Sequence, residues 1–274
     1  MILLLGATGK VGRLLRAAWP GAVGARARLE PVGRSGADLH LWAPGAPTDR
    51  LPRPDAIAAL WGVTPGPGRD LDENLRLALA AQALGDALGA RMVLHASSAA
   101  VYRPGPVPLR EDPAPDPQTA YGAAKAAMEA ALAEARGPRA VALRIGNVAG
   151  ADSLFAALSD DTPLTLDRFA DGAGPARSYI APSDLARVLA ALAMAEPGTL
   201  PPALNVAAPE ATGMDDIARA AGRPITWRPA PPGAAARVAL ETGRLARICR
   251  LGPAAAEPDH LVADWRRCAE AAPA

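Results

Sequence analysis

The 274-residue chain has a formal net charge of +1, with 50% hydrophobic, 4% aromatic and 21% charged residues. A chain of this length can bury a large core, and alanine, leucine and valine must supply most of the packing because aromatic side chains are few. The balanced charge, with no run of like charges, argues against nucleic acid or an anionic membrane as a partner and leaves small-molecule chemistry as the expectation.

Cysteine usage and the N-terminus bear on the compartment. Cys249 and Cys268 lack the spacing of metal ligands, so we expect structural thiols in a reducing compartment and no metal site. The apolar run at residues 1–5 is short, and the lysine and arginines that follow it do not fit an export signal. No stretch approaches the roughly 18 apolar residues that span a bilayer. We therefore expect a cytoplasmic protein without a membrane partner.

Short apolar segments alternate with helical segments over the first 150 residues. The expected strands are residues 1–5, 28–33, 55–63, 91–98 and 140–148, and the expected helices are residues 13–19, 72–89 and 118–135. Pro20 and Gly21 are expected to end the first helix, and six prolines keep residues 103–119 irregular. The alternation predicts an α/β fold with a parallel sheet covered by helices on both faces, followed by a smaller C-terminal lobe.

The segment GATGKVG places three glycines between the first strand and the first helix. Glycines there let the backbone approach a pyrophosphate, which the N-terminus of the helix attracts. A plain glycine turn is the alternative, because spaced glycines also occur without a ligand. The strand–turn–helix context favours a dinucleotide site, to which we assign Gly6, Thr8, Gly9, Lys10, Val11 and Gly12.

The residues after the second strand bear on which dinucleotide is bound. A carboxylate there would bind the ribose hydroxyls of NAD, whereas an arginine would accommodate the additional phosphate of NADP. Arg34 and Ser35 stand at this point, so NADP is expected and NAD is the alternative, with a solvated surface arginine as the rival interpretation of Arg34. Asp38 and the adjoining Leu39 are assigned to the adenine end, where an ordinary loop aspartate is the rival.

Tyr121 and Lys125 are four residues apart on an expected helix and share one face, and Lys125 is one of only two lysines. An ammonium about 4 Å away, at an effective dielectric of about 20, would stabilise the phenolate of Tyr121 by roughly 4 kcal/mol. That stabilisation would lower the tyrosine pKa from about 10 to near 7. The pair could therefore exchange a proton with a hydroxyl that becomes a carbonyl while a nicotinamide exchanges hydride. A surface helix pair is the alternative.

Ser98 ends the expected strand 91–98, at the edge of the sheet where ligands bind in parallel α/β folds. We assign it to stabilise the developing alkoxide, although a serine that only caps its strand is the alternative. His95 on the same strand is expected to be a core residue without a catalytic role.

The segments GATGKVG, SSAAVY, YGAAK, LRIGNVAG and RSYIAPSDLA occur in the order found in the extended short-chain dehydrogenase/reductases, the NAD(P)-dependent epimerase/dehydratase family. The chain resembles this family over roughly residues 1–210. The resemblance implies a Rossmann-type doubly wound parallel sheet at residues 1–150, on which residues 176–196 pack back, and a small substrate lobe at residues 151–274. It also implies a homodimer through the helices at residues 72–89 and 118–135.

The resemblance further implies a set of site residues and a substrate class. The catalytic residues would be Ser98, Tyr121 and Lys125, of which Lys125 also holds the nicotinamide ribose. The substrate contacts would be Ser98, Asn147 and Arg177, and the substrate would typically be a nucleotide sugar. Trp61 stands where the family has a small residue beside the cofactor, so we assign its ring to the cofactor site, where it would reshape the nicotinamide pocket.

These features together predict an NAD(P)-dependent oxidoreductase or epimerase acting on a carbonyl or secondary alcohol. Dehydration is the least expected activity, because Ala99 and Ala100 replace the acidic pair of the dehydratases that the chain resembles. The alternative is a non-catalytic NAD(P)-sensing protein on the same fold. The serine, tyrosine and lysine set argues against that alternative, since a sensor needs no acid/base group.

Overall fold

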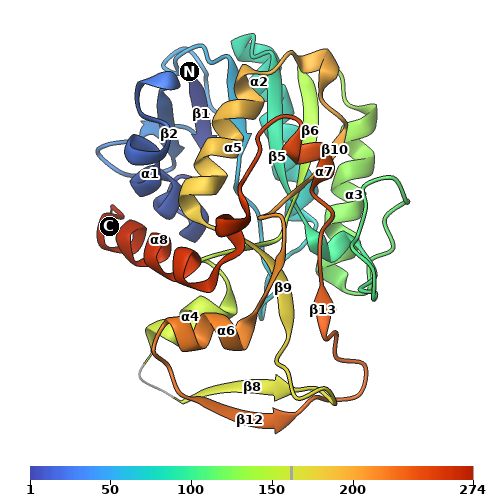
Figure 1. The fold of residues 1–274 in the computed structure, drawn as a ribbon. Helices are drawn as coiled ribbons and strands as arrows, with labels where there is room; N and C mark the ends of the chain where they lie inside the picture. Colours follow the sequence, from blue (N-terminus) through green and yellow to red (C-terminus); the bar gives the residue numbers. More distant parts are fainter. Residues whose placement is uncertain (161–162, 274) are drawn as a thin grey trace.

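The computed structural model describes residues 1–160 and 163–273. Its centre is a seven-stranded sheet in which all neighbouring strands are parallel, in the order β10–β6–β5–β4–β1–β2–β3 (Figure 1). The strands are β1 (Ile2–Leu5), β2 (Leu29–Gly33), β3 (His40–Leu41), β4 (Ala56–Ala59), β5 (Met92–Ser98), β6 (Arg139–Ile145) and β10 (Ala203–Val206). The strand order reverses between β1 and β4, as in a doubly wound sheet.

Helices cover both faces of the sheet, and strand alternation decides which side chain meets which helix layer. Ile2 and Leu4 pack with α1 (Lys10–Ala22) and α5 (Pro182–Met194), whereas Leu3 and Leu5 pack with α2 (Glu73–Leu88). α3 (Ala120–Glu134) lies beside α2, and α8 (Pro258–Glu270) packs on α1 and α5. The predicted Rossmann-type α/β fold is confirmed, and burial on both faces explains why β1 is a continuous apolar run.

The structure differs from the predicted elements at Pro20 and at Gly146. α1 continues through Pro20 to Ala22, because a proline in the last turn removes a single helical N–H. The N–H of Val23 donates to the Trp19 carbonyl at 2.9 Å, which keeps that turn closed. The strand predicted at residues 140–148 is divided at Gly146 into β6 and β7 (Asn147–Val148), and β7 pairs with β9 (Ala176–Ile180) instead of continuing the main sheet.

A smaller lobe lies beyond the carboxyl ends of the main strands, at the bottom of Figure 1. It contains α4 (Ser153–Ser159), α6 (Met214–Ala220) and a two-stranded ribbon of β8 (Leu164–Arg168) and β12 (Ile225–Pro229). β9 pairs with β11 (Ala211–Gly213) and β13 (Arg237–Val238), and the short helix α7 (Gly243–Ala246) contacts β10. Because α5, β10 and α8 also come from residues after 150, the division of the chain at that residue stays a prediction.

The parallel arrangement gathers the assigned residues at one edge of the sheet. Gly6 follows β1, Arg34 follows β2, Trp61 follows β4, Ser98 ends β5, and Asn147 follows β6. In open α/β sheets this edge carries the ligand crevice, at the point where the strand order reverses. Among the described residues, no helix is both long and apolar enough to cross a bilayer.

A close approach between α3 and the segment after β5 provides a test of this packing. A Cβ atom on Gly122 would lie 2.0 Å from the carbonyl oxygen of Ala100, so Gly122→Ala must push the helix away from that segment. We expect the free energy of unfolding to fall by about 1–3 kcal/mol, as for an overpacked core. Urea unfolding measures the change. The control is Gly21→Ala in α1, where a Cβ would meet nothing within 4 Å and stability should hold or rise. Equal stability of the two variants would contradict the packing described.

Candidate active site

The glycine turn after β1 is too tight for any larger residue at two of its positions. Gly6 has a φ of +85°, and a Cβ there would lie 2.8 Å from the backbone nitrogen of Trp61. A Cβ on Gly12 would lie 2.1 Å from the Gly6 carbonyl oxygen. The N–H of Gly9 donates to that same oxygen at 3.0 Å and closes the turn. The backbone of the turn is therefore exposed at Thr8, Gly9 and Lys10, where a ligand could approach it.

Helix α1 begins at this turn and presents its N-terminus to the crevice. Its first turn reads Lys-Val-Gly-Arg and contains no acidic residue, and no side chain of the described residues caps it. The positive end of the helix dipole and the first N–H groups, from Lys10 and Val11, are thus not neutralised by the chain itself. These features fit the pyrophosphate of a dinucleotide.

Arg34, Asp38 and Leu39 lie together after β2 but face different partners. Arg34 is exposed, and none of the ion pairs formed within residues 1–160 and 163–273 includes it. Asp38, four residues after Arg34, pairs with Arg16 of α1, which neutralises that carboxylate. Leu39 lies over Gly33, since a Cβ on that glycine would meet its Cδ1 at 2.6 Å. Arg34 is therefore a cation beside the end of β2 that forms no ion pair with any described residue.

Ser98, Tyr121 and Lys125 meet at the carboxyl end of β5. Thr119 starts α3 by accepting the N–H of Gly122 at 3.1 Å, which places Tyr121 in the first turn of the helix. The hydroxyl of Ser98 accepts the N–H of Ala100 at 3.2 Å and lies close enough to the Tyr121 phenol to favour its ionised form. One turn further on, Lys125 is only 3% exposed, and its Nζ donates to the carbonyl oxygen of Ala96 at 2.7 Å. Nζ lies 5.8 Å from the centre of the Tyr121 ring.

The pKa of the phenol differs from the sequence-based expectation. Burial raises the pKa of Tyr121, and the Ser98 hydrogen bond only partly opposes this rise. Burial also lowers the pKa of Lys125 to about 8, although the nearby Glu129 carboxylate favours its charged form. The expected lowering of the Tyr121 pKa is absent because burial of the phenol dominates, and Nζ of Lys125 donates to the Ala96 carbonyl oxygen instead of to the phenol. The phenol is therefore protonated at neutral pH and able to donate.

Glu129 is a residue of this site that the sequence reasoning missed. It accepts hydrogen bonds from Arg144 at 2.7 and 3.1 Å and from the Ser97 hydroxyl at 2.5 Å, and its side chain is 9% exposed. Arg144 also donates to the Tyr102 hydroxyl at 2.8 Å. The spacing of four residues between Lys125 and Glu129 puts both on one helix face and could have indicated the pair.

Asn74 was missed as well. It is 2% exposed and lies in the first turn of α2. Its side chain accepts the N–H of Val63 at 3.1 Å and donates to the carbonyl oxygens of Val63 at 2.9 Å and Leu71 at 3.0 Å. These bonds hold the loop that follows Trp61. The only indication of Asn74 in the sequence is that it is a lone asparagine in a helix rich in alanine and leucine.

The two assigned substrate residues lie on the strands that lead into the smaller lobe. Asn147 donates to the Asp152 carboxylate at 2.6 Å, and the hydroxyl of Tyr179 donates to the same carboxylate at 2.9 Å. Arg177 donates to the carbonyl oxygen of Ala176 at 2.8 Å, and burial lowers its pKa. Within the described part of the chain, Arg177 forms no ion pair, so it is a partly buried cation suited to an anionic group.

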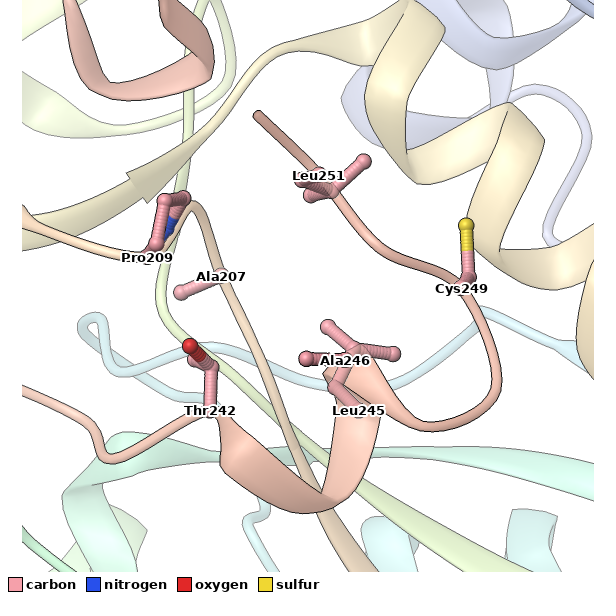
Figure 2. A pocket seen from close by; sticks show the side chains of 7 residues that line it. All are labelled: Ala207, Pro209, Thr242, Leu245, Ala246, Cys249 and Leu251. Atoms are coloured by element: carbon pink, nitrogen blue, oxygen red, sulfur yellow. The ribbon is translucent and has the colours of Figure 1, made fainter. Parts of the chain in front are cut away.

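A separate pocket of about 200 Å³, including its opening, lies between α7 and the segment after β10 (Figure 2). Its lining residues are Ala207, Pro209, Thr242, Leu245, Ala246, Cys249 and Leu251. None of the residues assigned from the sequence belongs to this lining. The polar groups suited to catalysis lie at the sheet edge instead, so this pocket is not the candidate active site.

Comparison with protein families finds a match to the NAD dependent epimerase/dehydratase family over residues 2–207. Comparison with curated proteins finds no match. Solved structures resemble the whole chain, and three of them illustrate this likeness.

The first is TunA, an NAD-dependent NDP-hexosamine 5,6-dehydratase, with a TM-score of 0.77, 18% identity and coverage of 98% of this chain and 97% of that one. MoeE5 in complex with UDP-glucuronic acid and NAD has a TM-score of 0.76 and 20% identity, and the coverage is 98% and 99%. The UDP-glucose 4-epimerase of Thermus thermophilus in complex with NAD has a TM-score of 0.71 and 21% identity, with 98% of each chain covered. At these identities the likeness shows the fold.

The buried ammonium of Lys125 makes stability depend on pH. Its folded pKa of about 8 lies below the ordinary lysine value of 10.5, so the unfolded chain binds more protons between these values and stability rises with pH there. As the pH rises across this range, the free energy of unfolding of the wild type should increase by up to about 3 kcal/mol relative to that of Lys125→Met, as measured by urea unfolding. Lys10→Met, at an exposed position, is the control. Parallel pH curves for the wild type and Lys125→Met would contradict the burial of the charge.

Proposed function

The chain belongs to the NAD dependent epimerase/dehydratase family, and from this we propose that it is an NAD(P)-dependent epimerase or reductase acting on a nucleotide sugar. The reaction would move hydride at a carbon that alternates between secondary alcohol and carbonyl. The observation that carries the proposal is the grouping of Ser98, Tyr121 and a buried Lys125 at the same sheet edge as the glycine turn. A binding protein without turnover has no use for that arrangement.

Each residue of the set has a chemical role in this proposal. NAD(P), when bound, supplies the hydride donor or acceptor. Tyr121 holds a proton on its phenol in the free protein and can donate it to a carbonyl oxygen. The hydroxyl of Ser98 lies beside the Tyr121 phenol and would stabilise the charge that develops on the substrate carbonyl oxygen. Lys125 adds a positive charge that Glu129 helps to maintain.

The cofactor would be held by the glycine turn and by the end of β2. Gly6, Gly9 and Gly12 bring the backbone and the N-terminus of α1 to the pyrophosphate. Arg34 would meet the 2′-phosphate of NADP, and the pairing of Asp38 with Arg16 removes the repulsion that a free carboxylate would exert there. We therefore propose NADP as the preferred cofactor, with NAD as the alternative.

A nucleotide sugar is the proposed substrate for two reasons. Arg177 is a partly buried cation that forms no ion pair among the described residues, so its charge is available to a diphosphate group. Similar structures contain UDP-sugars, as MoeE5 does with UDP-glucuronic acid and with UDP-glucose. Ala99 and Ala100, in the 3₁₀ turn directly after Ser98, offer no acid or base for dehydration, so epimerisation or reduction is preferred.

Tyr121→Phe tests the acid/base role. Removing the hydroxyl should lower kcat by at least about 10²-fold and leave dinucleotide affinity unchanged, because only proton transfer is lost. The measurement pairs NAD(P)H fluorescence titration with turnover on a panel of UDP-sugars. Wild-type turnover in the variant would refute the role. Dinucleotide binding without any turnover in the wild type would instead identify a sensor.

Arg34→Ala tests the choice of cofactor. Loss of a charged contact to the 2′-phosphate should weaken NADPH binding by about 10-fold or more and leave NADH binding unchanged. The matched control is Arg26→Ala, another exposed arginine, which precedes β2 at its opposite end. Tighter binding of NADH than of NADPH by the wild type would overturn the NADP assignment.

A further inference from the structure

Two buried nitrogen atoms without a protein partner belong to residues that line one pocket. Within residues 1–160 and 163–273, the only such side-chain atoms are Nε1 of Trp61, Nδ1 of His95 and Nε of Arg139. Trp61 and His95 line the same pocket, together with Ala59, Asn74, Ala78, Ala96 and Met128. Ala96 is the residue whose carbonyl oxygen accepts from Lys125, so the pocket lies directly behind the buried ammonium.

The tautomer of His95 follows from its other nitrogen. Gln82 donates its amide N–H to the carbonyl oxygen of Pro138 at 2.6 Å, which turns its oxygen toward Nε2 of His95 at 3.1 Å. Nε2 must therefore carry the proton. Burial and the charge of Lys125 lower the pKa of His95 to about 3, so the ring is neutral. Nδ1 is consequently a bare acceptor on a side chain that is 1% exposed.

Nε1 of Trp61, the other unpaired nitrogen, is a hydrogen-bond donor. An indole nitrogen can only donate a hydrogen bond. Leaving either nitrogen unpaired in the interior costs free energy, and buried polar groups are nearly always satisfied by protein or by ordered water. The pocket is narrow, with room for about one water-sized sphere, which is the space that a single ordered water needs. Water is the small molecule that accepts from one group and donates to the other.

We propose that this pocket is a binding site for an ordered water molecule that accepts the indole N–H of Trp61 and donates to Nδ1 of His95. His95 is then a positioning residue for Trp61. The hydrogen-bonded chain runs from Trp61 through water, His95 and Gln82 to the backbone at Pro138. The proposal does not depend on the activity proposed above.

The site has a consequence for the glycine turn. The Trp61 ring stacks on Trp42, with ring centres 6.0 Å apart, and the backbone nitrogen of Trp61 lies where a side chain on Gly6 would clash. Fixing the indole from its nitrogen side therefore fixes the segment that supports the glycine turn. Lys125 contributes by keeping His95 neutral, which preserves the acceptor on Nδ1.

Nuclear magnetic resonance of the ¹⁵N-labelled protein tests the site directly. Trp61→Phe assigns the indole signal of Trp61. We expect a cross-peak between this indole proton and a long-lived water, and a His95 coupling pattern with the proton on Nε2. Trp19, whose indole donates to the carbonyl oxygen of Ala27 at 2.8 Å, should show no such water and is the internal control.

Two substitutions of His95 separate its two nitrogen positions. His95→Asn keeps a polar atom near Nδ1 and should retain the water contact. His95→Gln keeps one near Nε2, so it should lose the water contact and shift the Trp61 indole signal while the Trp19 signal stays in place.

Three results would overturn the proposal. The first is the absence of a cross-peak between the Trp61 indole proton and a long-lived water in the native protein. The second is a His95 coupling pattern with the proton on Nδ1. The third is a scalar coupling between the indole nitrogen and Nδ1, which would reveal a direct bond. All three are read from the native fold, so they hold even if a His95 variant fails to fold.

Discussion

The hydrogen bond from the buried Lys125 ammonium to the Ala96 carbonyl oxygen is the interaction on which the candidate site depends. It ties α3 to β5 at the point where the phenol of Tyr121 must meet the hydroxyl of Ser98. A charge taken out of water needs compensation. The carbonyl supplies part of it, and Glu129, itself held by Arg144, supplies a second part. The acid/base pair thus rests on a polar network that reaches across α3, β5 and β6.

Local patterns in the sequence were sufficient for the fold and for gathering the candidate site residues at one sheet edge. Apolar runs between helical segments predicted the doubly wound sheet, and five short segments in order predicted the family, which the match over residues 2–207 confirms. Parallel strands bring their carboxyl ends to one edge, so the placement of Gly6, Ser98 and Trp61 at that edge followed from chain order alone.

The features that the sequence did not reveal depend on contacts between distant residues. Glu129 and Arg144 lie 15 residues apart, and their pairing requires α3 to pack on β6. The pKa of Tyr121 is raised because the phenol is buried, and helix spacing cannot specify that burial. The helix end predicted at Pro20 is wrong because a proline is tolerated in the last turn, and the sequence does not show where α1 stops. The roles of the site residues themselves stay predictions.

The division of one strand at Gly146 constrains how the two parts of the protein can move. The N–H of Gly146 donates to the carbonyl oxygen of Val206 in the main sheet at 3.0 Å, and three residues later Ala149 donates to Ile180 of β9 at 3.0 Å. The chain is thus held by backbone hydrogen bonds on both sides of this junction, which restricts hinge motion there. Of the lobe's strands, β8 and β12 pair only with each other among the described residues. The ribbon is therefore attached to the lobe by side-chain packing rather than by sheet hydrogen bonds, with Leu164 and Leu166 of β8 buried in one apolar cluster with residues of α4 and α6.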